Sequence, residues 1–227
     1  MSEATRAENA TPVPYDLEAH YQELEQKITS AGIPADLGRV RAAFECADRA
    51  HSGQKRRDGS PYVSHCIAAA IITAEMGLDE DSIIAALLHD CTKKLDMDEQ
   101  LALCKKYHIP LDELERKALK LLHSKTGAAI ARDVFAVDDD VYNAIMYHTT
   151  GKPDMTLLEK IIYLADYIEP TRDFPGVETL RRTVYEDLDR GLLMGLTMTI
   201  DEMEEMGNPV HHMTRDARDY LMKRGIS

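Results

Sequence analysis

An adjacent imidazole and carboxylate, His89-Asp90, end the apolar run 83–88 and suggest metal-assisted hydrolysis. Imidazole nitrogen and carboxylate oxygen together suit borderline divalent metals such as iron, manganese or zinc, and a carboxylate can bridge two of them. A histidine followed by an aspartate is common by chance, so the doublet needs companions. Further candidate ligands lie on both sides of it, at His65, His123, His148 and Asp166.

These six candidate ligands would suffice for two metal ions. Four ligands would hold one ion, and two more imidazoles with a shared carboxylate, for which Asp90 is the candidate, would hold a second ion about 3.5–4 Å away. Paired metals suit phosphoanhydride hydrolysis because they neutralise phosphate oxygens and lower the pKa of bound water from about 15.7 toward 7. Taken singly, His65 and His148 could equally be helix-end histidines that bond to the backbone. The remaining histidines are interpreted as surface or capping residues: His20, His51, His108, His211 and His212.

Several residues near the candidate ligands could bind phosphate. Lys93 follows the doublet, and Arg172 follows the last candidate ligand. Thr149 and Lys152 lie in the segment TTGKP, although Pro153 prevents the helix-opening arrangement of a P-loop. Such basic and hydroxyl groups can stabilise the charge that develops on a leaving phosphate. The catalytic candidates are Asp90 and Lys93, and the substrate-binding candidates are Lys93, Thr149, Lys152 and Arg172.

The composition is that of an acidic protein of 227 residues, with a formal net charge of −13 and a pI near 5.1. This charge disfavours binding to nucleic acid or to an anionic membrane, since both would repel the protein. No apolar segment is long enough to span a bilayer, and the polar N-terminus is unlike a signal peptide. The four cysteines lack CxxC spacing and are typical of reduced, buried thiols. We therefore expect a cytoplasmic protein, with a homodimer left open by its methionine-rich C-terminal part.

Apolar residues recur at helical intervals along most of the chain, and no region shows the alternation of a strand. Residues 1–14 are expected to form a disordered leader, and residues 15–227 a single domain. Thr156 and Glu159 predict a capping box at the start of one helix. The sequence therefore predicts an all-α fold. The expected helices cover residues 17 to about 31, 37–51, 63–76, 79–89, 98–107, 111–123, 127–135, 140–147, 156–168, 178–205 and 215–223.

Three segments resemble the YqeK-type HD-domain hydrolases. They are residues 89–93 (HDCTK), 146–153 (MYHTTGKP) and 165–172 (ADYIEPTR), and the continuation 173–177 fits as well. Members of this family are symmetrical dinucleoside-tetraphosphate hydrolases, in which a di-iron centre splits diadenosine tetraphosphate into two ADP. The resemblance spans roughly residues 89–199 and implies an HD-domain helical bundle.

The same resemblance implies a role for each candidate ligand. It implies that His65, His89, Asp90 and Asp166 bind one metal and that His123 and His148 complete the second around Asp90. It also implies binuclear iron, with manganese or another divalent metal as an alternative. The implied partner is a dinucleoside polyphosphate substrate, which is cleaved into two nucleoside diphosphates.

The N-terminal part instead resembles the HD domain of RelA/SpoT-type guanosine-alarmone hydrolases. Residues 50–56 and 59–65 are similar to the basic turn before the first metal-binding histidine of those enzymes, where the turn contacts the guanosine substrate. In that family a Glu-Asp pair used in hydrolysis follows the His-Asp pair, whereas this chain has Lys93-Lys94 there. The absent acidic pair argues against removal of pyrophosphate from the 3' position of ppGpp. The basic turn keeps this reaction as one alternative function, and a non-catalytic HD-fold nucleotide sensor is another.

Overall fold

The computed structural model describes residues 15–227 and consists of helices joined by loops and turns in this range. The expected leader, 1–14, lies outside the described residues. Within 15–227 the all-α prediction is confirmed, since no strand forms and the one backbone bridge joins Lys55 to Pro61. The helices are α1 (Leu17–Ser30), α2 (Leu37–Ala50), α3 (Val63–Glu75), α4 (Glu80–Leu88), α5 (Met97–Lys106), the 3-10 turn η1 (Glu115–Lys117), α6 (Leu119–Phe135), α7 (Asp139–Tyr147), α8 (Leu157–Ile168), α9 (Val177–Glu186), α10 (Leu188–Glu205) and α11 (His212–Lys223).

Helix α6 differs from the sequence prediction of two helices over 111–123 and 127–135. It continues through Gly127 without a break, and residues 111–118 hold only the short turn η1. A Cβ at Gly127 would lie 3.4 Å from the carbonyl oxygen of His89, at the tight limit of ordinary van der Waals contact. The glycine therefore lies where α6 approaches the backbone of the doublet closely, instead of ending a helix.

The segment 178–205 was expected to be one helix and forms two. Asp187 has an extended backbone, with a φ of −154°, which ends α9. Its side chain then accepts hydrogen bonds from the backbone N–H groups of Asp189 and Arg190, and so begins α10. The apolar periodicity of the segment does not reveal this single capping residue.

Helix starts are set by polar caps, which fix where the ends of the helices lie. The side chain of Asp79 caps α4 by accepting from the backbone of Ser82. The capping box of Thr156 and Glu159 forms at the start of α8 as expected, with Glu159 accepting from the Thr156 N–H at 2.7 Å. Exact starts matter here because several candidate ligands lie at or next to helix ends.

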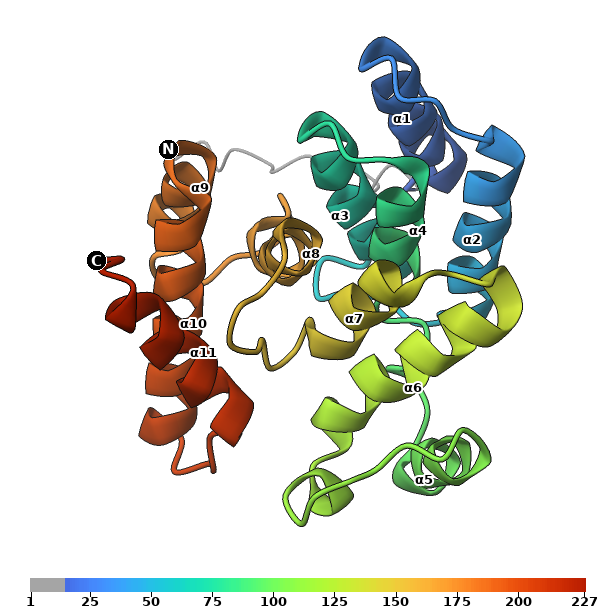
Figure 1. Ribbon diagram of the computed structural model, residues 1–227. Coiled ribbons are helices and arrows are strands. Elements are labelled where there is room, and N and C mark those ends of the chain that lie inside the picture. Colours follow the sequence, from blue (N-terminus) through green and yellow to red (C-terminus); the bar gives the residue numbers. More distant parts are fainter. Residues whose placement is uncertain (1–14) are drawn as a thin grey trace, which may run out of the picture.

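Helix α8 lies in the middle of the molecule (Figure 1). It packs against α3, α4 and α7 on one side and against α9 and α10 on the other. Helix α3 is the most enclosed element, because every residue from Val63 to Ala74 is buried. The apolar faces of α3, α4 and α8 therefore form a continuous core that holds the candidate ligands in place.

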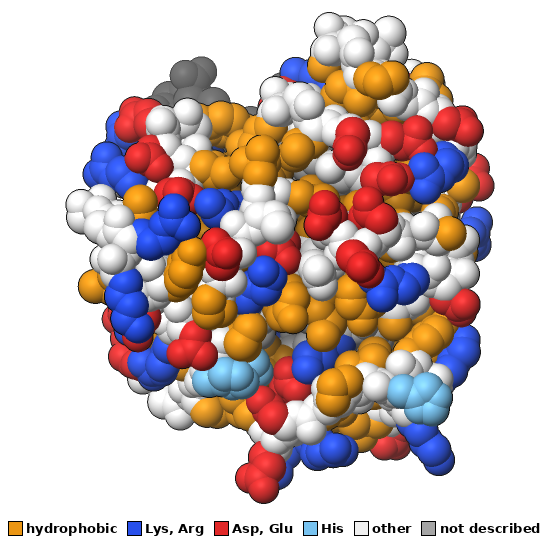
Figure 2. Space-filling model, in the orientation of Figure 1, with side chains coloured by type: hydrophobic (Ala, Val, Ile, Leu, Met, Phe, Trp, Pro, Cys, Tyr) orange, Lys and Arg blue, Asp and Glu red, His pale blue; other side chains and the backbone are white. Residues whose placement is uncertain are grey.

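Acidic and basic side chains are interspersed with hydrophobic ones on the face shown in Figure 2, and neither charge forms a continuous patch there. None of the helices within 15–227 combines the length and the apolar character that crossing a membrane requires.

Candidate metal centre

The six candidate ligands come from five helices. His65 lies in the first turn of α3, His89 caps the C-terminus of α4 and Asp90 follows it directly. His123 lies within α6, His148 caps α7, and Asp166 lies in the last turn of α8. Five of the six residues are buried, and the side chain of Asp166 is 15% exposed. The structure thus brings together, in its interior, polar residues that lie far apart in the sequence.

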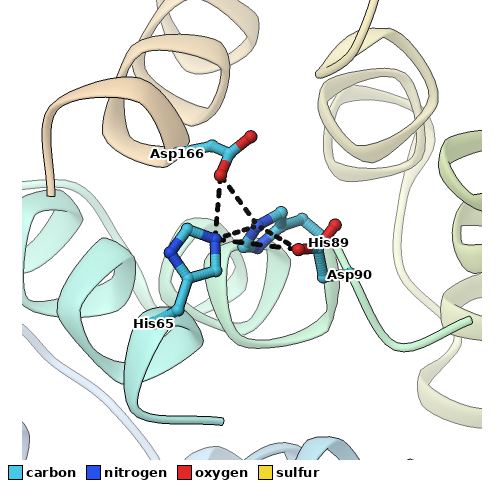
Figure 3. Close-up of side chains that lie close together, drawn as sticks. All are labelled: His65, His89, Asp90 and Asp166. Carbon is cyan, nitrogen blue, oxygen red and sulfur yellow. Dashed lines mark hydrogen bonds and ion pairs between the residues drawn. The ribbon is translucent and has the colours of Figure 1, made fainter. Parts of the chain in front are cut away.

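The first group contains His65, His89, Asp90 and Asp166, whose side chains point toward one another (Figure 3). His65 Nε2 lies 2.8 Å from Asp166 Oδ1 and 3.2 Å from His89 Nε2. Asp90 Oδ2 lies 3.7 Å from His65 Nε2 and 3.6 Å from His89 Nε2. One small ion could contact all four side chains.

The second group shares Asp90 and adds His123 and His148. The other carboxylate oxygen, Asp90 Oδ1, lies 3.1 Å from His123 Nε2 and 3.5 Å from His148 Nε2. The two imidazole nitrogens are 3.1 Å apart. The two oxygens of Asp90 therefore face different histidine pairs, as a bridging carboxylate would.

The tautomers of the histidines test whether these groups fit a cation. His89 Nδ1 lies 2.7 Å from the Ala86 carbonyl oxygen, and His148 Nδ1 lies 2.7 Å from that of Ile145. A carbonyl only accepts, so Nδ1 carries the proton and Nε2 presents a lone pair. His65 is held in the same tautomer by a carboxylate 3.1 Å from its Nδ1. Imidazole lone pairs and carboxylate oxygens are all hydrogen-bond acceptors, so they cannot satisfy one another. Their convergence fits a divalent metal.

Asp90 is ionised in spite of its burial. Burial opposes its negative charge, but His89 and the ammonium group of Lys93 outweigh this and hold the pKa of the carboxyl well below its usual range. Asp90 Oδ2 accepts hydrogen bonds from Lys93 Nζ at 2.8 Å and from Tyr62 Oη at 2.9 Å. Asp90 Oδ1 is buried without a hydrogen-bond partner among the described residues. Such an orphaned anionic oxygen fits a metal ligand.

His148 is a neutral imidazole at neutral pH, because burial lowers its pKa to about 4. Asp166 is anionic: burial opposes its ionisation, but the guanidinium of Arg172 holds the pKa of the carboxyl well below its usual range. Neutral imidazoles and anionic carboxylates are the protonation states that bind metal without first losing a proton.

A cleft of about 1110 Å³ opens beside the first group, and Asp166 forms part of its wall. Lys93 and Arg172, both predicted to bind phosphate, line this cleft. Basic and aromatic side chains make up much of the rest of the wall: Lys55, Arg56, Arg57, Tyr62, Tyr167 and Phe174. Acidic side chains also line the cleft, at Asp58, Asp173, Asp201, Glu202 and Glu205, so its wall is mixed in charge. Lys93 and Arg172 place two cationic groups, and the aromatic rings flat apolar surfaces, next to the candidate metal centre.

The other two predicted phosphate ligands lie elsewhere. Thr149 Oγ1 donates to Ser124 Oγ at 3.1 Å, and Lys152 Nζ lies 3.0 Å from the buried carboxylate of Glu159. Neither residue lines the cleft. Their contribution to substrate binding therefore stays a prediction that their contacts do not support.

Sequence reasoning missed Glu169 as a functional residue. It is fully buried, and its carboxylate contacts His65 Nδ1 and Arg56 Nη2. Burial opposes ionisation of Glu169, but hydrogen bonds from His65 and Thr171 lower its pKa to about 2. The available signal was its place one helical turn after Asp166. The hydrogen bond from Tyr62 to Asp90 was not predicted from the sequence either.

Two histidines interpreted as surface or capping residues do cap helices but are buried. His51 caps the C-terminus of α2 and His211 the N-terminus of α11. His211, His212 and Asp112 form a third group within metal-binding distance. Here His211 Nδ1 accepts from the Met213 N–H at 3.2 Å, which places the ring proton on Nε2. That nitrogen has no lone pair for a metal, so capping explains this group.

Comparison with known proteins agrees with this geometry. The HD domain model matches residues 62–171, which include all six candidate ligands. The symmetrical bis(5'-nucleosyl)-tetraphosphatase of Halalkalibacterium halodurans is 40% identical over 140 residues, which cover 61% of this chain and 74% of that protein. The bifunctional (p)ppGpp synthase/hydrolase SpoT of Escherichia coli is 45% identical over 71 residues, or 31% of this chain and 10% of SpoT.

A solved structure is similar over most of its length. The predicted HD superfamily hydrolase involved in NAD metabolism from Clostridium acetobutylicum superposes with a TM-score of 0.71 at 37% identity, and covers 81% of this chain and 97% of that one. The similarity to SpoT is confined to a short segment, whereas the other two relatives share the greater part of the chain. The chain belongs to the HD-domain family, in the YqeK-type group of the symmetrical bis(5'-nucleosyl)-tetraphosphatases.

Proposed function

We propose that this chain is a metal-dependent phosphohydrolase that cleaves diadenosine tetraphosphate and related dinucleoside polyphosphates symmetrically into two nucleoside diphosphates. The observation that carries this proposal is the placement of Asp90, whose two oxygens face two histidine pairs beside a cleft that Lys93 and Arg172 line. A carboxylate shared in this way suits two metal ions, and paired metals suit in-line displacement at phosphorus. The names of the relatives support the substrate class.

Each group in the proposed site has a distinct task. His65, His89, Asp90 and Asp166 would hold one divalent metal, and Asp90, His123 and His148 the second. Metals bound there supply the charge that neutralises phosphate oxygens and the acidity that yields hydroxide at neutral pH.

Lys93 and Arg172 would donate hydrogen bonds to the polyphosphate and offset the negative charge that develops on the departing diphosphate. Burial opposes the positive charge of Lys93, but Asp90 raises its pKa above the usual value, so the ammonium group keeps its proton. The cleft, at about 1110 Å³, is slightly larger than the range of about 300–1,000 Å³ typical of ligand pockets, which suits a substrate with two nucleosides.

The finer parts of the proposal rest on the family resemblance and on composition. Iron is the proposed metal, with manganese as the alternative. All four cysteines are unpaired, which agrees with the proposed cytoplasmic location. The homodimer remains a prediction, and sedimentation velocity tests it directly.

A second candidate, 3'-pyrophosphohydrolysis of ppGpp, is favoured by one observation. The basic turn Lys55-Arg56-Arg57 lines the same cleft as Lys93 and Arg172. The cleft therefore holds further cationic side chains besides the two that lie next to the candidate metal centre. A guanosine carrying two diphosphates could use this additional charge.

Product analysis distinguishes these activities. The protein, loaded anaerobically with Fe²⁺ or with Mn²⁺, is incubated separately with diadenosine tetraphosphate and with ppGpp, and the nucleotides are resolved by ion exchange. We expect ADP as the only nucleotide product of the first reaction and no product from Asp90→Asn. GDP and pyrophosphate from ppGpp alone would make the second candidate correct. Binding of either nucleotide without turnover would favour the sensor.

A further inference from the structure

Glu169 connects the candidate metal centre to the basic turn. It follows the last residue of α8 and is fully buried. One of its oxygens, Oε1, lies 3.1 Å from His65 Nδ1 and 2.8 Å from Arg56 Nη2. The other, Oε2, accepts from the Thr171 N–H at 2.7 Å. A single carboxylate therefore joins a proposed metal ligand to an arginine of the cleft, and it lies 113 positions after that arginine in the sequence.

The contact with His65 fixes how that imidazole meets a metal. A carboxylate accepts the proton of Nδ1, which leaves the lone pair of Nε2 directed at the first group. A hydrogen-bonding partner behind a metal-bound histidine fixes its tautomer and ring orientation and raises its basicity. Loss of the partner would let the His65 ring turn and would weaken that metal site alone.

The contact with Arg56 fixes how the basic turn meets the cleft. The side chain of Arg56 is only 13% exposed, and it lines the cleft beside the candidate metal centre. The Glu169 carboxylate offsets the cost of holding its charge in this enclosed position. Arg172 contacts the same oxygen, with Nε 3.5 Å from Glu169 Oε1, and pairs more closely with Asp166. The carboxylate that orients His65 thus also contacts two arginines of the cleft.

We propose that Glu169 is a positioning residue that sets the affinity of the first metal site, through His65, and the affinity for polyphosphate, through Arg56. The metal part stands on the geometry of the site, whereas the polyphosphate part rests on the proposed function. The two affinities would therefore fall together when this one carboxylate is lost, although the residue itself contacts neither the metal nor the substrate.

Titration of the metal-free protein with Mn²⁺ tests the first part. We expect two binding phases for the wild type. In Glu169→Gln the phase that depends on His65 should weaken about 10–100-fold, with the phase of Asp90, His123 and His148 changed less than threefold. Glu115→Gln is the matched control, because Glu115 is also a buried carboxylate, paired with Lys125 outside the centre. It should leave both phases unchanged.

The two parts separate in a third variant. Arg56→Ala should raise KM for diadenosine tetraphosphate while leaving both Mn²⁺ phases within twofold of the wild type, and Glu169→Gln should change both quantities. Mn²⁺ affinities of Glu169→Gln equal to those of the control, or equal weakening of both phases, would overturn the proposal. If Glu169→Gln does not fold, Glu169→Asp takes its place, since its shorter carboxylate cannot reach both partners. Absence of turnover by the wild type would contradict the proposed function and leave the metal titration decisive.

Discussion

The phenol of Tyr62 donates a hydrogen bond of 2.9 Å to Asp90 Oδ2, the oxygen that faces His65 and His89. Tyr62 also lines the cleft, so it forms a connection between the carboxylate shared by the two groups and the proposed substrate. Tyr62 directly precedes α3, and Asp90 follows His89, which caps the C-terminus of α4. Both partners of this hydrogen bond therefore lie at helix ends next to the candidate metal centre.

Replacement of Tyr62 by Phe removes this donor and keeps the ring. We expect kcat/KM to fall about 10-fold, because hydrogen-bond partners of metal ligands contribute about 10–100-fold to affinity or activity. Burial and the nearby Asp90 raise the pKa of the Tyr62 phenol, so it stays protonated and keeps donating throughout the range from neutral to mildly alkaline pH. The ratio of wild-type to variant kcat/KM should therefore be constant over that range, and a ratio that collapses toward one at the alkaline end would contradict this role.

Replacement of His123 by Ala should remove one metal site and keep the other. His123 belongs only to the group with His148 and Asp90, so the four ligands of the first group remain. Metal content after loading with Mn²⁺, measured by mass spectrometry, should fall from two ions to one per chain, with loss of diadenosine tetraphosphate hydrolysis. His212→Ala, which alters an exposed histidine on α11, should retain two ions and full activity. Full activity of His123→Ala would instead support a one-metal reaction.

Lys93 and its neighbour Lys94 should differ sharply in their effect on catalysis. Lys93 Nζ lies 2.8 Å from Asp90 and lines the cleft, whereas Lys94 Nζ contacts the Ser52 carbonyl oxygen on the surface. We expect Lys93→Ala to lower kcat about 100-fold, the order of effect of removing one preorganised donor to a developing charge. Lys94→Ala should lower kcat less than twofold. Similar losses in the two variants would show that only the general positive charge of this segment matters.

Two glycines of α10 should respond in opposite ways to the addition of one methyl group. A Cβ at Gly191 would lie 2.6 Å from Val184 Cγ2 and 2.8 Å from Val184 Cα, so α9 and α10 would have to separate. We expect Gly191→Ala to lower the free energy of unfolding by about 1–3 kcal/mol. A Cβ at Gly195 would make an ordinary contact of 3.5 Å with Leu164, so Gly195→Ala should raise stability by up to about 1 kcal/mol through helix propensity. Urea unfolding measures the free energy of unfolding of both variants. A Gly191→Ala variant as stable as the wild type would contradict the close packing of α9 against α10.

The sequence predicts the helices that have strong local signals. The capping box of Thr156 and Glu159 fixes the start of α8, and Gly77, with a φ of 76°, follows α3 as a left-handed residue should. The six candidate ligands could be named because histidines and aspartates on apolar helices need partners once they are buried, and in the structure they lie in two adjoining groups.

Other features depend on contacts that no local pattern encodes. Gly127 is a residue typical of helix ends, yet it lies inside α6, and its packing against the His89 carbonyl oxygen is not visible in the sequence. Glu169 and Arg56 meet across more than a hundred positions, so neither residue reveals the other. His211 is buried by the packing of α11, although its surroundings in the sequence are polar.

The ligands of the candidate centre are distributed over α3, α4, α6, α7 and α8, and none of these helices supplies enough of them to bind a metal alone. A metal would therefore bind the assembled bundle and not the unfolded chain, so coordination would stabilise the tertiary structure. At a free metal concentration 100 times the dissociation constant, such linkage contributes about 2.7 kcal/mol for each site. The concentration of free metal would then affect the stability of the folded protein as well as the rate of catalysis.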